Sequence, residues 1–150
     1  MLGPDYKEDS PWPLAAWKPQ GVHVSVGQMT YSSVIIDVGA GHGVSALYLD
    51  RAKVTRYVVV DPNVAMHEHI RRTAVRVGLT EGDGSLIVLG CGIEDVAAVR
   101  AALGTEGPRA NMRRADTVIS ILTLCSVPNS RDTIRAPVRD LLKPGGVLLF

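Results

Sequence analysis

The sequence of 150 residues predicts one α/β domain with a doubly wound, mostly parallel sheet covered by helices on both faces, a three-layer α/β/α arrangement. Short β-branched runs alternate with segments whose apolar residues recur at helical spacing. The runs are also continuously apolar, as is typical of parallel strands buried on both faces. The predicted strands are VIID (34–37), RYVVV (56–60), SLIVLG (85–90), DTVISIL (116–122) and GVLLF (146–150).

The first strand leads into the pattern D-x-G-x-G-x-G (37–43), followed by a short helix whose apolar side is Val44, Leu47 and Tyr48. Glycine adopts positive φ and lets a ligand approach the backbone, and the start of a helix offers unpaired N–H groups. In open α/β sheets ligands bind at this end of the strands. We therefore predict a binding site here; the alternative is a tight turn without a ligand.

Apolar spacing predicts two further helices. The segment 64–77 ends at Gly78 and the next segment ends at Gly104, and glycine commonly stops a helix. The last helix, before the fifth strand, contains Pro137, which removes a backbone donor. It either begins near Pro137 or is kinked there. The apolar positions are Met66, Ile70, Ala74 and Val77 in the first of these helices and Val96, Val99 and Leu103 in the second.

Composition narrows the classes of function. The 16 basic and 15 acidic residues give a net charge of +1, which offers no overall attraction to nucleic acid or to an anionic membrane. Cys91 and Cys125 form neither a disulfide framework nor a zinc motif. No apolar run reaches the roughly 18 to 20 residues that cross a bilayer. We expect a cytoplasmic protein that contacts neither nucleic acid nor membranes.

Residues 1–30 differ from the remainder of the chain, because four of the nine prolines and both tryptophans, Trp12 and Trp17, lie there. Prolines at this frequency prevent long helices and central strands. We predict an irregular arm over 1–30 and a ligand-binding domain over 31–150. The arm either packs on the domain through its aromatic residues or is a partly disordered terminus.

The glycine spacing separates two cofactor classes. A dinucleotide fingerprint, G-x-G-x-x-G, requires glycine where this chain has Val44. The pattern from Asp37 to Gly43 instead resembles the first motif of class I S-adenosylmethionine-dependent methyltransferases, which have a Rossmann-like fold. The resemblance implies that S-adenosyl-L-methionine is the cofactor and that Asp37 orients its methionine amino end; the alternative for Asp37 is hydrogen bonding to loop N–H groups without a ligand. The residues implied to line the cofactor's path are Gly39, Ala40, Gly41 and Gly43.

Asp61 ends the second strand, 22 residues after Gly39. An acid at this position accepts hydrogen bonds from ribose hydroxyls in both cofactor classes. Pro62 ends the strand and Asn63 is placed to cap the next helix. We predict that Asp61, Pro62 and Asn63 lie in the cofactor site, with Asn63 acting mainly as the cap.

The resemblance implies that the turn after the third strand, LGCGIEDV, holds the adenine edge through Gly92, Ile93 and Glu94. Glu94 alternatively lies in the first turn of the next helix, where the dipole favours it. Leu122, in the exit LTLCSV of the fourth strand, is a further expected cofactor contact. This exit, together with DPN (61–63), is similar to the methyltransferase-like-seven group, which is associated with methylation of alkyl thiols.

No catalytic residue is assigned from the sequence. Methyl transfer depends mainly on in-line positioning in a dry pocket, and a thiol acceptor needs only help in losing its proton. His42 is the nearest candidate base, although its place between two glycines is typical of a surface loop. His67 and His69 do not share a helix face, so a metal pair is not expected. Cys125 is interpreted as a small buried hydrophobic residue.

The chain ends at Phe150 inside the fifth predicted strand, whereas the superfamily continues with a helix and two more strands. We therefore expect an apparently truncated sheet, whose exposed edge invites a second copy or a partner chain.

The primary hypothesis is methyl transfer to a small-molecule thiol or other heteroatom. The alternatives are a non-catalytic S-adenosylmethionine-binding or interaction module and, third, an NAD-dependent oxidoreductase. No N-P-P-Y-like sequence, which nucleic-acid amino methyltransferases commonly carry, follows the fourth strand.

Overall fold

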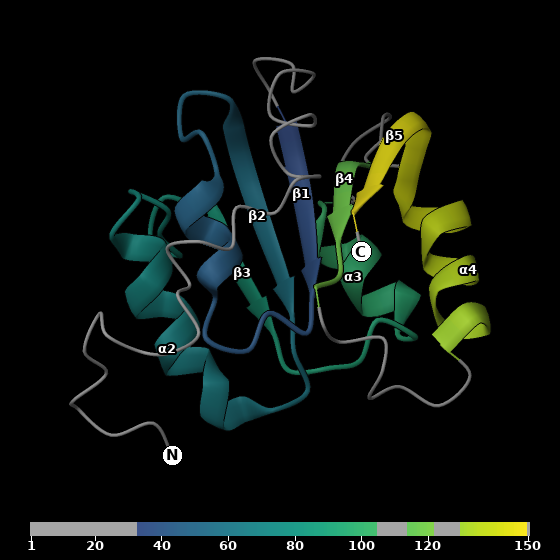
Figure 1. Ribbon diagram of the computed structural model, residues 1–150, viewed down its shortest axis with the longest axis horizontal. Helices are drawn as coiled ribbons and strands as arrows, with labels where there is room; N and C mark the ends of the chain where they lie inside the picture. Colours follow the sequence, from purple (N-terminus) through teal and green to yellow (C-terminus); the bar gives the residue numbers. More distant parts are fainter. Residues whose placement is uncertain (1–32, 105–113, 122–129, 150) are drawn as a thin grey trace, which may run out of the picture.

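A five-stranded sheet in the order β3-β2-β1-β4-β5 forms the centre of the computed structural model, which describes residues 33–104, 114–121 and 130–149 (Figure 1). Each pairing between neighbouring strands is parallel. The predicted arm over 1–30 lies outside the described residues. The strands are β1 (Ser33–Val38), β2 (Val54–Val60), β3 (Leu86–Leu89), β4 (Ala115–Ile119) and β5 (Leu142–Leu149).

Helices cover both faces of the sheet, which confirms the predicted three-layer fold. Successive strand residues point to opposite faces, so β1 sends Ile35 into one core cluster and Ile36 into the other. The first cluster includes Ala46 of η1 (Val44–Tyr48) and Ile70 of α2 (Val64–Val75), and the second includes Val99 of α3 (Val96–Ala102) and Leu141 of α4 (Ser130–Leu141). The helical spacing of Met66, Ile70, Ala74 and Val77 and of Val96, Val99 and Leu103 is confirmed, because each of these side chains is buried in a cluster or packed against it.

The short helix after the glycines differs from the prediction. It is the 3-10 helix η1, and the side chains expected to be buried, Val44, Leu47 and Tyr48, are 39%, 41% and 40% exposed. Ala46 is the residue that packs into the core. A 3-10 helix has three residues per turn, so residues three apart align on one face, and here Val44 and Leu47 share the exposed side.

The last helix also differs. Of the two predicted alternatives, the late start near Pro137 is wrong, because α4 runs from Ser130 through Pro137 to Leu141. The chain then enters β5 at Leu142, four residues earlier than predicted. Between Ala115 and Thr117 of β4, the facing β5 chain advances from Leu142 to Val147, so the Lys-Pro-Gly-Gly segment is accommodated as an irregularity in the strand. As predicted, β5 lies at an edge of the described sheet.

Candidate functional site

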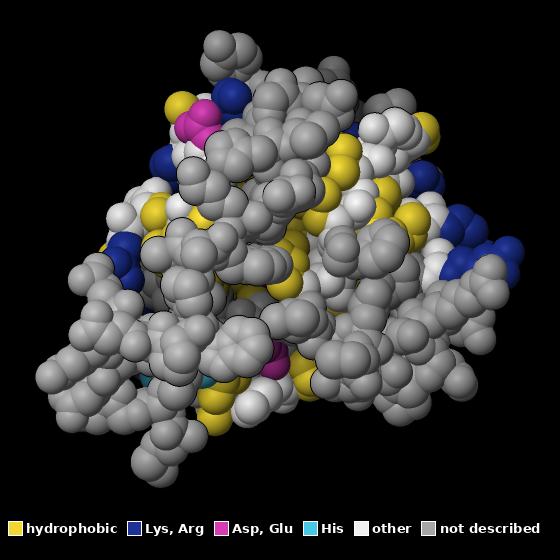
Figure 2. Space-filling view, in the orientation of Figure 1, with side chains coloured by type: hydrophobic (Ala, Val, Ile, Leu, Met, Phe, Trp, Pro, Cys, Tyr) yellow, Lys and Arg dark blue, Asp and Glu magenta, His cyan; other side chains and the backbone are white. Residues whose placement is uncertain are grey.

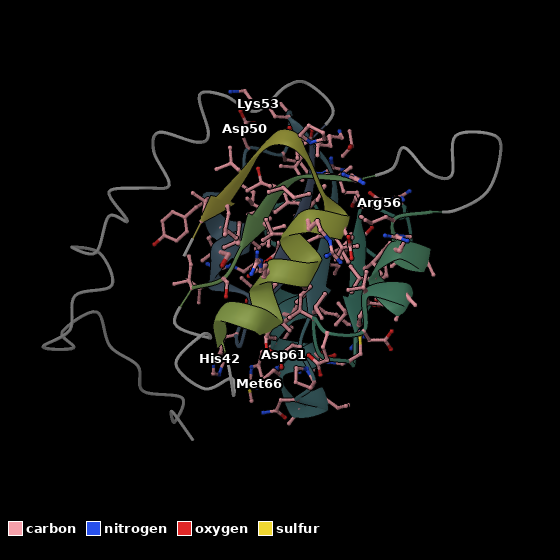
Figure 3. All side chains as sticks on the ribbon, turned by 90° about the vertical axis from the view of Figure 1, so that its right-hand side faces the viewer. His42, Asp50, Lys53, Arg56, Asp61 and Met66 are labelled. Carbon is pink, nitrogen blue, oxygen red and sulfur yellow. The ribbon has the colours of Figure 1, made fainter. Side chains whose placement is uncertain are left out.

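The carboxyl ends of β1 and β4 lie where the order of the sheet reverses, because β1 is followed by β2 on one side and has β4 on the other. Such a switch point is the usual ligand site of open α/β sheets. In Figure 3, His42, Asp61 and Met66 lie at this end of the molecule, and Asp50, Lys53 and Arg56 lie at the opposite end. The predicted motif therefore occupies the expected place.

Each glycine of the motif adopts the left-handed backbone conformation that the glycine at every second position predicts. The φ angles are 65° at Gly39, 55° at Gly41 and 72° at Gly43. A Cβ atom on Gly41 would meet nothing within 4 Å, so this glycine leaves open space above the loop. A Cβ atom on Gly43 would lie 3.0 Å from the Cα atom of Ile70, so Gly43 allows the loop to pack against α2. The two glycines thus serve different purposes.

Side chains of α2 hold the loop from below. The Thr73 hydroxyl donates to the carbonyl of His42 over 2.9 Å. The rings of His42 and His69 lie with centroids 4.8 Å apart and a tilt of 59°. His67 points the other way and is buried, with Nε2 donating to the Asp61 carbonyl over 2.8 Å. His67 and His69 therefore lie on different faces, and within the described ranges no group of three or more potential metal ligands occurs.

Asp37 is only 1% exposed, although it is a charged residue at a strand end. The Tyr57 hydroxyl donates to its Oδ2 over 2.5 Å, and the Ser45 hydroxyl also donates to the carboxyl. Burial raises the pKa of Asp37 from 3.8 to about 6, against the lowering effect of these two hydrogen bonds, and the nearby charge of Asp61 adds to the rise. The site therefore contains a buried carboxyl whose ionised form is destabilised, and a cationic ligand would stabilise that form.

Asp61 is 5% exposed and organises the loop. Its Oδ2 accepts from the backbone N–H of Gly41 over 3.0 Å, and its Oδ1 accepts from that of Asn63 over 2.9 Å. A carboxylate offers about four acceptor positions, so two remain for a ligand. The Asn63 side chain accepts from the N–H of Ala65 over 3.2 Å, which confirms its role as the cap of α2.

The turn after β3 brings a carboxylate back over a glycine. A Cβ atom on Gly92 would collide with the Glu94 carboxylate, so Glu94 folds across the bare backbone at this position. The Ile93 side chain is buried in the second core cluster. The alternative that placed Glu94 in the next helix is wrong, because α3 begins at Val96 with Asp95 as its N-cap, whose side chain accepts from Ala98.

The fold brings three further residues to this site, Ser45, Tyr57 and Ser120, which no local sequence signal had indicated. Ser120 follows β4 and is 1% exposed, and its hydroxyl has no hydrogen-bond partner in the described part of the chain. A buried polar atom without a partner is uncommon and calls for a ligand or water. The predicted contact Leu122, and Cys125, lie outside the described residues.

These features fit a nucleoside cofactor with a cationic amino acid tail. The loop glycines leave the backbone accessible. The buried carboxyls of Asp37 and Asp61 lie at the ends of neighbouring strands, and the buried hydroxyl of Ser120 lies at the end of β4. Asp37 suits an ammonium group, and the free acceptor positions of Asp61 suit hydroxyl groups. The charge and the open backbone of this arrangement are compatible with a small charged nucleoside at the switch point of the sheet.

A family model described as a methyltransferase domain matches residues 19–150. The chain belongs to this methyltransferase-domain family, and the predicted membership of the class I S-adenosylmethionine-dependent superfamily is confirmed. The cofactor that this membership implies is S-adenosylmethionine. No curated protein matches the sequence significantly.

Solved structures share the fold at low identity. A protein of Methanococcus maripaludis assigned to the S-adenosyl-L-methionine-dependent methyltransferases matches with a TM-score of 0.60 and 15% identity over 85% of this chain and 52% of its own. The YcgJ protein of Bacillus subtilis matches with a TM-score of 0.59 and 18% identity, and the match covers 85% of this chain and 48% of YcgJ. A methyltransferase of Thiobacillus denitrificans in complex with S-adenosyl-L-homocysteine matches with a TM-score of 0.56 and 16% identity, and the match covers 87% of this chain and 46% of the methyltransferase. The chain thus spans about half the length of these structures.

Proposed function

We propose that this chain is the cofactor-binding part of an S-adenosylmethionine-dependent methyltransferase whose acceptor is a small molecule with a thiol or another nucleophilic heteroatom. The observation that carries the proposal is the pair of buried acids, Asp37 and Asp61, at the ends of adjacent strands beside a loop of left-handed glycines. A structural role alone does not explain why the buried carboxyl of Asp37 has two hydroxyl donors and a neighbouring acid, but no cation, among the described residues.

Each residue has a role that follows from its position. Asp37 receives the amino group of the cofactor, and the two free acceptor positions of Asp61 receive the ribose hydroxyls. The backbone at Gly39, Ala40, Gly41 and Gly43 lines the cofactor's path, with Pro62 and Asn63 beside it, and Gly92, Ile93 and Glu94 border the base. S-adenosylmethionine, when bound, supplies an electrophilic methyl group on a sulfonium. The protein then contributes positioning and exclusion of water.

Charge supports a small acceptor in preference to nucleic acid. The cluster Arg71, Arg72 is neutralised in the structure, because Arg71 binds both oxygens of Glu81 over 2.9 and 3.2 Å and Arg72 binds Glu68 over 3.0 Å. The described Lys and Arg side chains visible in Figure 2 lie toward the margins of that face. A nucleic-acid enzyme would be expected to gather such charges along its site. In the described ranges, each helix is too short or too polar to cross a membrane.

The first test is calorimetric titration of the full chain with S-adenosylhomocysteine and with NAD. We expect binding of the sulfur nucleoside and none of NAD. Asp61→Ala should lower the affinity for S-adenosylhomocysteine by about tenfold or more, because a hydrogen bond to a charged group contributes about 1.5 to 3 kcal/mol. Asp50→Ala is the matched control, since Asp50 is a partly exposed acid at the opposite end of the sheet (Figure 3), and it should leave the affinity unchanged.

Unchanged affinity in Asp61→Ala, or absence of binding in the wild-type chain, would overturn the proposed cofactor site. Turnover is measured separately with a panel of alkyl thiols and phenols. Tight binding without transfer to any acceptor would favour the alternative of a non-catalytic cofactor-binding module.

A further inference from the structure

The core of the domain contains a tyrosine that reaches the cofactor site from inside. Tyr57 of β2 is 0% exposed, and its ring packs in the first core cluster with side chains of η1 and α2. Its Cα atom pairs with that of Ile35 in β1. Asp37 lies two residues further along β1 and on the same face, so the long tyrosine side chain reaches its carboxyl.

The hydroxyl of Tyr57 is placed more firmly than a surface donor would be. Packing fixes the ring, and the phenol has only two side-chain torsions, so the donor position is set by the core. The O–H donates to Oδ2 of Asp37 over 2.5 Å, a length typical of a charge-assisted bond. Burial and the adjacent carboxyl raise the pKa of Tyr57 well above 10.0, so this hydroxyl remains a donor at every ordinary pH.

The other groups that act on Asp37 do not supply a positive charge. From η1, Ser45 donates a second hydrogen bond, and from the end of β2, Asp61 contributes a negative charge. Within the described part of the chain, the Asp37 carboxyl is therefore held by two hydroxyl donors and opposed by one acid. Desolvation by the packed core is the largest influence on its ionisation.

We propose that Tyr57 is a positioning residue for the cofactor, whose hydroxyl holds the Asp37 carboxyl in the orientation and the ionised state that receive the cofactor's ammonium group. This inference rests on the proposed function. A phenylalanine would fill the same core volume, so the hydroxyl is explained by its action on Asp37 and not by packing. The residue acts through Asp37 and does not itself contact the cofactor.

The proposal predicts a specific dependence on pH. The hydrogen bond from Tyr57 lowers the pKa of Asp37, which is about 6 with the bond present. Removing the bond raises that pKa, so more of the ligand-free protein carries a neutral Asp37 at a given pH. Only the ionised carboxylate pairs strongly with an ammonium group. Loss of the hydroxyl should therefore weaken binding more at low pH than at high pH.

The experiment is titration of wild-type and Tyr57→Phe full chains with S-adenosylhomocysteine from pH 5 to pH 8. The ratio of the variant's affinity to the wild-type affinity is followed, because ionisation of the ligand affects both proteins equally and cancels. We expect this ratio to be about tenfold lower at pH 5 than at pH 8, the effect of one hydrogen bond to a charged group. Tyr48→Phe, the same change on a side chain that is 40% exposed, should give a ratio near one at each pH.

A ratio that does not change with pH would overturn the proposal, because a residue needed only for packing lowers affinity equally across the range. Failure of the wild-type chain to bind S-adenosylhomocysteine would instead overturn the proposed function, and the role of Tyr57 with it. If Tyr57→Phe does not fold, ¹³Cζ-tyrosine labelling of the wild-type chain gives the answer. The Tyr57 resonance should titrate near pH 6 in the free chain and lose that titration in the complex; a resonance insensitive to both pH and ligand would overturn the proposal.

Discussion

The buried carboxyl of Asp37 lowers the stability of the ligand-free chain when it is ionised, although the ionised form is the one proposed to bind the cofactor. Its pKa in the folded chain is about 6, above its ordinary value of 3.8. Between these two values the folded chain holds a proton that the unfolded chain has released, so the free energy of unfolding falls as pH rises from about 4 to about 6. The difference of about two pH units corresponds to a loss on the order of 3 kcal/mol. The protein retains a destabilising charge where a ligand would neutralise it.

Replacement of Asp37 by Asn should therefore stabilise the ligand-free chain at pH 7. The amide fills a similar volume, still accepts from Tyr57 and carries no charge to desolvate. We expect urea unfolding to show a higher free energy of unfolding at pH 7 than in the wild type, a smaller difference at pH 4, and greatly weakened binding of S-adenosylhomocysteine. The interpretation would be contradicted if the free energies of unfolding of the wild type and of Asp37→Asn were both constant between pH 4 and pH 6.

Among the elements, the glycine loop combines two constraints that substitution can separate. Gly41, Gly43 and Gly84 all have positive φ, of 55°, 72° and 74°. A Cβ atom would meet nothing within 4 Å at Gly41 or Gly84, but would lie 3.0 Å from the Ile70 Cα atom at Gly43. Alanine at the first and last positions thus incurs only the left-handed penalty, about 1 to 2 kcal/mol. At Gly43 the helix must also move.

The three alanine variants form a matched set. Gly84→Ala should lower stability by about 1 kcal/mol and leave binding unchanged, because this turn lies away from the site. Gly41→Ala should lower stability to the same extent but also weaken S-adenosylhomocysteine binding, since the open space at Gly41 lies on the proposed path of the cofactor. Gly43→Ala should cause the largest loss of stability. Thermal unfolding with and without ligand measures both quantities, and equal binding by Gly41→Ala and Gly84→Ala would rule out the proposed path of the cofactor.

The elements also show what a sequence can and cannot reveal. Strand order along the chain, the helix predicted over 64–77 and the place of the glycine loop follow from local pattern, because apolar periodicity and glycine spacing are local properties. The helix ends two residues earlier than predicted, at Val75. The exposure of Val44 and Leu47 was missed because it depends on how η1 packs on α2. The pairing of Tyr57 with Asp37 was missed because it depends on the register of two strands, which no single segment determines. Local signals likewise left open whether α4 would begin near Pro137 or continue through it.

At the scale of the whole molecule, the two ends of the sheet have different tasks. The carboxyl end holds Asp37 and Asp61, and burial of the Asp37 charge is unfavourable without a ligand. The amino end has an acid with a structural role. Asp116 of β4 accepts from the Val34 N–H over 2.8 Å and from Lys143 Nζ over 2.7 Å, and so connects β1, β4 and β5. The register shift of β1 between Ser33 and Val34 accompanies this side-chain bond.

Asp116→Ala should therefore destabilise the chain without affecting the cofactor site. The Val34 N–H would lose its acceptor, at a cost of about 1 to 2 kcal/mol. Lys143→Ala removes only a half-exposed ion pair, with side chains 41% and 22% exposed, and should cost less than about 1 kcal/mol. Urea unfolding gives both values, and titration with S-adenosylhomocysteine under conditions where each variant is folded should return the wild-type affinity. Weaker binding by folded Asp116→Ala would mean that the two ends of the sheet are coupled through β1, the strand that carries Asp37. The amino end would then affect ligand binding as well as stability, and the two ends would not have separate roles.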